Sequence, residues 1–120
     1  MFGKHEITLN RVRGKVTFRE GAEKLTLRVD GDAMRLVVGL EQTQRMLKVI
    51  TTETPKEEIQ QAARFFASVI FGDEQTEKLM EFYLNDGSCV INVCGKYMTE
   101  VLFKKITAAQ KKTAKADRKK

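Results

Sequence analysis

The chain has little histidine and cysteine, the residues that most often bind zinc, and little tryptophan and proline. Its 120 residues include no tryptophan, one proline, one histidine and two cysteines. Cys89 and Cys94 are five positions apart, which on a helix places them on different faces. Together with His5 they do not make up a zinc-binding set. We therefore expect two reduced, buried thiols and no bound metal or cofactor.

Long apolar runs and catalytic motifs are also absent. The longest apolar run, residues 65–71, covers about two helical turns, whereas a membrane-spanning helix needs roughly 20 apolar residues. The first residues lack the basic and then apolar order of a secretory signal, which predicts a cytoplasmic protein. The sequence contains no nucleophile elbow, phosphate-binding loop or zinc-protease motif. These observations predict that the protein is not an enzyme.

The positive charge is concentrated at the C-terminal end. The net charge is +6, of which +5 falls in residues 111–120 and +1 in the other 110 residues. The basic residues of this end are Lys111, Lys112, Lys115, Arg118, Lys119 and Lys120. No apolar side chain larger than alanine follows residue 112, so we predict one domain, 1–112, and a basic disordered tail, 113–120. Such a tail either keeps the chain soluble or touches phosphate weakly, without sequence preference.

The first thirty residues have the pattern of β structure. Apolar and polar residues alternate in 15–19 and again in 25–30, and a short connection containing Gly21 lies between them. This pattern predicts a hairpin with Val16 and Phe18 on the same face as Leu25 and Leu27. Residues 5–9 are a weaker candidate for a third strand. Since a bare hairpin is only marginally stable, it must pack against the rest of the chain.

Four helices are predicted after the hairpin, and each has a polar residue at its expected start. The predicted N-caps are Asp32, Thr54, Asp73 and Ser88, and at Thr54 a capping box with Glu57 is expected. Gly72 suits a positive φ just past the second helix, and residues 85–87 suit a turn before the last helix. The predicted fold class is therefore α+β, with an N-terminal hairpin or small meander followed by a four-helix, mainly α part.

The aromatic residues of the helices exceed what single apolar faces can bury. With 100° per residue, the last helix has an inner face of Val90, Cys94, Tyr97, Met98, Val101 and Leu102, and Phe103 lies on its polar side. Phe65 and Phe71 point in different directions around the second helix. Either another part of the chain covers these rings or they contact a partner. The candidate partner-binding residues are Phe65, Phe71, Phe82, Tyr83 and Phe103.

The order of helix ends in residues 25–110 resembles the tail assembly chaperones of long-tailed bacteriophages and prophages. The resemblance includes the Phe71-Gly72-Asp73 step at the end of an amphipathic helix, then Lys78-Leu79, then a turn at 85–87 and a last helix. It implies a non-enzymatic, often self-associating protein of the host cytoplasm. Such a protein binds the helical tape measure protein, keeps it soluble and helps to recruit tail tube subunits.

Two other functions remain open from the sequence. One is a small accessory protein that contacts nucleic acid through the basic C-terminal tail. The other is a regulatory or antitoxin-like binding module. Salt dependence distinguishes the first from a chaperone, because nucleic-acid binding weakens steeply as salt rises, whereas capture of an apolar helix does not.

Overall fold

The computed structural model describes residues 10–118, and the side chains of residues 10–111. Two strands are followed by helices, in agreement with the predicted α+β class. The elements are β1 (Arg11–Glu20), β2 (Glu23–Asp32), α1 (Ala33–Lys48), α2 (Lys56–Phe71), α3 (Asp73–Phe82), α4 (Gly87–Tyr97), the π-helical turn η1 (Met98–Leu102) and α5 (Phe103–Arg118). Within the described residues, no helix is long and apolar enough to cross a membrane. The possible third strand at 5–9 and His5 lie outside the described residues.

The predicted hairpin is confirmed, and the face that was predicted to be apolar is the buried one. β1 and β2 are antiparallel, and Gly21 and Ala22 connect them beyond the Glu20–Glu23 pair. Because side chains alternate between the two faces of a strand, one face carries the apolar residues toward the helices. Val12, Phe18, Leu27 and Val29 are buried on this face, and Val16 and Leu25 pack against them.

The hairpin leads directly into α1. Asp32 is the N-cap, as predicted, and its Oδ2 accepts a hydrogen bond from the Arg35 N–H at 3.1 Å. The Ala33 N–H donates to the Asn10 carbonyl at 2.8 Å, which ties the start of α1 to the beginning of β1. α1 ends at Lys48.

The other three predicted caps are wrong in detail, because a neighbouring residue takes the role each time. Pro55 is the N-cap of α2, and Thr54 Oγ1 instead accepts from the Thr51 N–H at 2.8 Å. Gly72, at φ 82°, is both the C-cap of α2 and the N-cap of α3, so Asp73 is already helical. Asp86 caps α4 in place of Ser88 and accepts from the Cys89 N–H.

The last helix of the fold is one long element interrupted by η1. The Phe103 N–H donates to the Met98 carbonyl, five residues back, which widens the helix locally. A regular helix would rotate Leu102 and Ile106 steadily away from the face that carries Val90 and Cys94. The wider turn brings all four of these side chains into the core, where they are buried.

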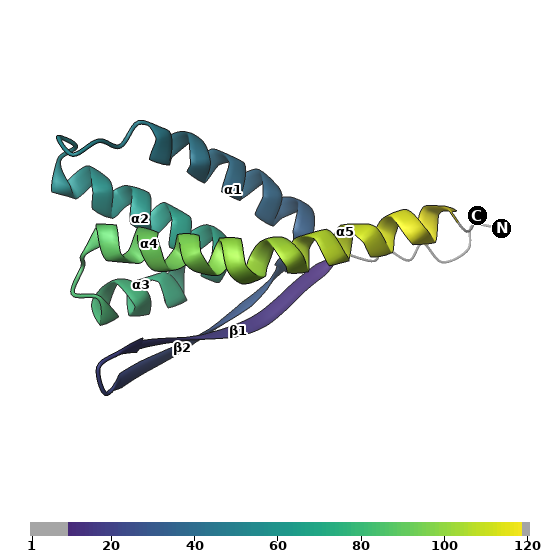
Figure 1. Ribbon diagram of the computed structural model, residues 1–120, viewed down its shortest axis with the longest axis horizontal. Helices are drawn as coiled ribbons and strands as arrows, with labels where there is room; N and C mark the ends of the chain where they lie inside the picture. Colours follow the sequence, from purple (N-terminus) through teal and green to yellow (C-terminus); the bar gives the residue numbers. More distant parts are fainter. Residues whose placement is uncertain (1–9, 119–120) are drawn as a thin grey trace.

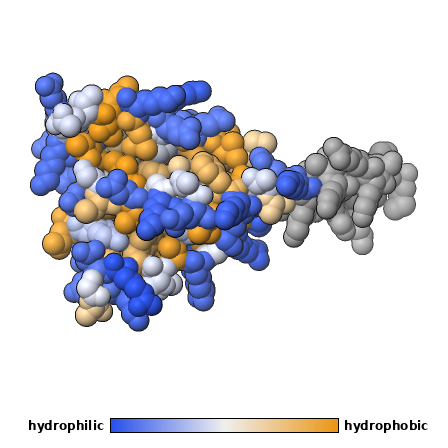
Figure 2. Space-filling model, in the orientation of Figure 1, coloured by the Kyte–Doolittle hydropathy of each residue, from blue (hydrophilic) through white to orange (hydrophobic). Residues whose placement is uncertain are grey.

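The core lies where the hairpin, α2, α3 and α4 meet. Phe18 contacts the rings of Phe71 and Tyr83 edge-on, and Phe71 stacks on Tyr97 with ring centroids 6.0 Å apart. In Figure 1, the hairpin crosses beside α3 and α4, while α5 extends away from the helical body. In Figure 2, hydrophilic side chains follow the line of α4 and the beginning of α5, and hydrophobic side chains lie beside them on the side toward α1.

The basic C-terminal segment differs from its prediction. α5 continues to Arg118, so residues 113–118, for which we expected no regular structure, are helical. Four of these six residues are alanine, lysine or arginine, which favour helices, and a helix that has already formed extends through them at little cost. Residues 119 and 120 lie outside the described range.

Candidate functional site

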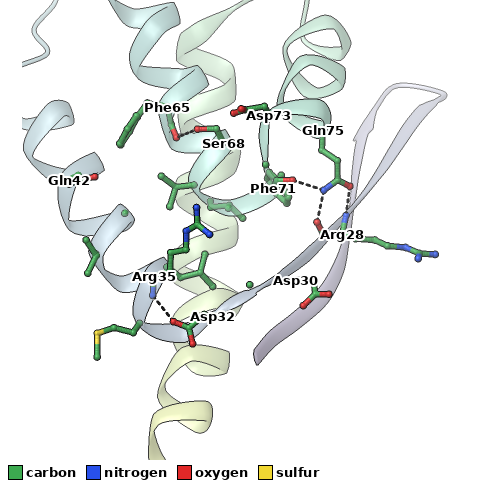
Figure 3. Close-up of a pocket in the computed structure, with 18 residues that line it drawn as sticks. Arg28, Asp30, Asp32, Arg35, Gln42, Phe65, Ser68, Phe71, Asp73 and Gln75 are labelled. Atoms are coloured by element: carbon green, nitrogen blue, oxygen red, sulfur yellow. Dashed lines mark hydrogen bonds between the residues drawn. The ribbon is translucent and has the colours of Figure 1, made fainter. Parts of the chain in front are cut away.

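A groove lies between α1 and the second half of α2, and we call it the α1–α2 groove. Its volume is about 970 Å³. The end of β2 and the beginning of α3 form one end of it, and α5 lies behind (Figure 3). Its lining includes apolar residues of both helices and polar residues of the strand end and the helix ends. They include Arg28, Asp30, Asp32, Met34, Arg35, Val38, Gln42, Phe65, Ser68, Val69, Asp73 and Gln75.

Four apolar side chains of the groove are incompletely covered. Met34 and Val38 lie one helical turn apart on α1 and are 61% and 48% exposed. Phe65 and Val69 lie one turn apart on α2 and are half-buried. Together these residues form an apolar strip that the chain itself leaves open to solvent.

The two helices approach closely at one point of the groove because α1 has a glycine there. A Cβ atom on Gly39 would lie 2.6 Å from Cγ1 of Val69, closer than real carbon contacts allow. The absence of a side chain at Gly39 therefore sets the distance between α1 and α2. Met34 and Phe65, which also line the groove, lie about one turn before this contact on α1 and α2.

Several polar groups of the groove hold the fold together. The Gln75 side chain accepts from the Arg28 N–H at 2.8 Å and donates to the Arg28 carbonyl at 2.7 Å, which fastens α3 to β2 (Figure 3). Ser68 Oγ donates to the Phe65 carbonyl within α2, and Asp32 caps α1. Arg35 differs from these groups. Its guanidinium extends into the groove and makes no ion pair with any described residue (Figure 3).

The predicted partner-binding aromatics do not form one site. Phe65 lines the groove. Phe103 lies on α5, outside the groove lining, and is 40% exposed. Phe71, which was also predicted to contact a partner, is buried between Phe18 and Tyr97. Phe82 and Tyr83 are half-buried and pack edge to face on each other, with ring centroids 5.0 Å apart. Met34 and Val38 were not predicted, although they are four residues apart and lie outside the apolar stripe of Leu36 and Leu40.

The basic candidates lie along α5. Lys111 is exposed, and Lys112, Lys115 and Arg118 belong to the same helix. Lys119 and Lys120 lie outside the described residues. Within residues 10–118, no group of three or more histidine, cysteine, aspartate or glutamate side chains could hold a metal ion.

The two thiols have different surroundings, so only half of the cysteine prediction holds. Cys94 is buried, and burial raises the pKa of its thiol to about 12. Cys89 is exposed, contrary to the prediction. A hydrogen bond from its sulfur to Asp86 Oδ2 raises the pKa of Cys89, and the Cys89 N–H lowers the pKa of the Asp86 carboxyl.

The pKa values of two tyrosines are also raised. Burial raises the pKa of Tyr97, whose hydroxyl is buried and has no hydrogen-bond partner among the described residues. Burial, with a smaller effect from the negative charge of Glu20, raises the pKa of Tyr83. Both tyrosines belong to the aromatic cluster around Phe18 and Phe71, so the shifts reflect core packing and not the groove.

Comparisons with protein-family models, with curated proteins and with solved structures found no match to the chain.

Proposed function

We propose that the protein is a non-enzymatic binding protein whose α1–α2 groove holds an amphipathic helix of another protein. The exposed apolar strip of Met34, Val38, Phe65 and Val69 carries this proposal. Leaving such side chains in water forgoes the free energy of burial, about 25 cal/mol for each Å². A partner that covers the strip recovers that free energy.

The dimensions of the strip suit a helical partner. Met34 and Val38 are one turn apart, and so are Phe65 and Val69, so each pair repeats at roughly the 5.4 Å pitch of a helix. Recognition of a helix in a groove uses anchors at this repeat. Methionine adapts its shape to different apolar surfaces. Arg35, which has no ion pair among the described residues, offers a cation to an acidic residue beside the apolar face of the partner.

The family resemblance supplies the setting of the proposal. A tail assembly chaperone of a long-tailed phage or prophage would hold the tape measure protein in this groove until the tail tube assembles around it. It would act in the host cytoplasm, self-associate and recruit tail tube subunits. The tape measure protein is helical and prone to aggregation, which fits an apolar groove with a polar rim.

The test begins with the gene neighbourhood, where the proposal expects a tape measure gene close downstream. Co-expression of the two proteins should keep the tape measure protein in the soluble fraction and allow the pair to be purified together. The double variant Met34→Asp/Val38→Asp should lose this effect, because two carboxylates would have to be desolvated in the groove.

A matched control uses Val49→Asp, since Val49 follows α1, is 76% exposed and does not line the groove. It should behave like the wild type. All variants are first checked for an unchanged circular dichroism spectrum and melting temperature. If the folded groove variant still solubilises the tape measure protein, the groove is not the binding site. If neither form does so, the chaperone function itself is wrong.

A further inference from the structure

The two faces of the hairpin differ sharply in charge. The inner face is apolar and packs on the helices. The outer face carries exposed basic residues on both strands, with two threonines between them. The basic residues are Arg11, Arg13, Lys15 and Arg19 on β1, and Lys24 and Arg28 on β2. Residues 1–110 are nearly neutral in total, so this concentration of charge became visible only when the register placed these residues on one face.

The half of the outer face nearer the turn has cations directly opposite each other. In the register of the hairpin, Lys15 pairs with Arg28 and Arg19 pairs with Lys24. Like charges in such positions destabilise a hairpin. None of these four side chains, which we call the tip quartet, makes an ion pair with a described residue. Figure 3 shows the Arg28 side chain pointing away from the α1–α2 groove.

The half nearer α1 is partly neutralised and provides a contrast. Asp30 Oδ1 lies 3.6 Å from Arg11 Nη1 and 3.4 Å from Arg13 Nε. Next to the turn, Glu20 and Glu23 are opposite each other in the strand register. Their side chains belong to the other face, so they do not lie among the tip quartet. The uncompensated charge of the hairpin is therefore concentrated on the outer face of its turn half.

The chemistry of this face selects among anionic partners. Thr17 and Thr26 occupy its centre, and their hydroxyls are 2.9 Å apart. Among the residues of the two strands, no aromatic side chain lies on this face for bases of a single strand to stack on. No apolar side chain lies there to insert into a membrane. What remains is a flat array of cations and hydroxyls, which suits the phosphates of a duplex.

We propose that the outer face of the hairpin binds the phosphate backbone of duplex nucleic acid without sequence preference. The tip quartet spans four residues along each strand, about 13 Å at roughly 3.3 Å per residue. The major groove of DNA is about 12 Å wide, so the two ends of the quartet reach phosphates on both sides of it. Lys105 on α5 donates to the Arg13 carbonyl at 2.9 Å and brings a further cation to the edge of β1.

Fluorescence anisotropy with a labelled DNA duplex of mixed sequence, about 30 base pairs long, tests this proposal. With about four phosphate contacts, raising NaCl from 50 to 200 mM should weaken binding by about a hundredfold. Neutralising the tip quartet (Lys15→Gln, Arg19→Gln, Lys24→Gln, Arg28→Gln) should weaken binding at least tenfold at 50 mM NaCl and reduce the salt slope. Its melting temperature should be equal to or above that of the wild type, since the opposed cations are gone.

The control variant removes the same number of charges from exposed residues of α1, α2 and α3, with Arg45→Gln, Lys48→Gln, Lys56→Gln and Lys78→Gln. It should bind like the wild type. Equal affinities of the two variants would overturn the proposal. So would loss of binding only on deletion of residues 113–120, which would assign the duplex to the C-terminal segment. Binding to phosphatidylserine vesicles without binding to the duplex would assign the face to membranes and would also overturn it.

Discussion

Helix α2 has two sides that are packed to different degrees. On the buried side, Ala63, Phe66 and Ala67 are covered completely, and the start of α4 approaches the α2 backbone so closely that Gly87 is required. On the groove side, Phe65 and Val69 remain half-covered, although Gly39 brings α1 close to them. The same helix therefore stabilises the fold with one side and leaves apolar surface for a partner on the other.

The strongest test of this difference compares two neighbouring phenylalanines. Phe66→Ala should lower the free energy of unfolding by about 3–5 kcal/mol, because it removes a ring that is 1% exposed and leaves a cavity. Phe65→Ala should cost about 1 kcal/mol, since part of the Phe65 ring is already in water. Urea unfolding followed by circular dichroism measures both. Equal losses would mean that the groove side is as essential to the fold as the buried side.

Two glycines of α4 test how tightly the buried side is closed. A Cβ on Gly87 would lie 2.9 Å from the Gln60 nitrogen and the Ile59 carbonyl oxygen, so Gly87→Ala should cost about 1–3 kcal/mol. A Cβ on Gly95 would meet no atom within 4 Å. Gly95→Ala should therefore stabilise the protein by up to about 1 kcal/mol through helix propensity. Thermal unfolding of both variants checks the prediction, and a stabilising Gly87→Ala would contradict the close approach.

Alkaline pH tests whether the buried side excludes water. Burial raises the pKa of Cys94 from 9.0 to about 12, so the folded state holds this proton more tightly than the unfolded chain. The resulting stability is complete below pH 9 and should be lost as the pH rises toward 12. Urea unfolding at several pH values measures this loss of the free energy of unfolding. In Cys94→Ala, the fall in stability that begins near pH 9 should be absent. At pH 8, a thiol reagent should label Cys89 in the folded protein and Cys94 only after unfolding.

The smallest expected effect concerns Tyr97, whose ring stacks on Phe71 at the end of α2. Its hydroxyl is buried and has no partner among the described residues, which costs free energy. Tyr97→Phe keeps the ring and removes the unsatisfied group, so it should be neutral or stabilise the protein by up to about 1 kcal/mol. A differential scanning calorimetry measurement that shows clear destabilisation would mean that the hydroxyl has a partner in solution.

Local patterns in the sequence were sufficient for the elements of the fold. Alternation of apolar and polar residues predicted the hairpin and its inner face, and helical spacing predicted α1, α2 and the core positions of α4. Caps were less predictable, because Asp86 and Ser88 are both good cap residues and only the geometry of the preceding turn selects between them. The π-helical turn was not predicted, because a fixed 100° per residue already placed Tyr97, Val101 and Leu102 on one face.

The sequence by itself determined the hairpin, the helices that build the core and the apolar face of each, because these properties depend on neighbours within a few positions. Only the tertiary structure decided that Phe71 is buried while Met34 and Val38 are exposed, since covering a side chain depends on elements far away in sequence. It likewise decided that Lys15 and Arg28, thirteen positions apart, face solvent side by side. Burial and charge density depend on which residues are neighbours in space, and the order of residues along the chain does not show which residues those are.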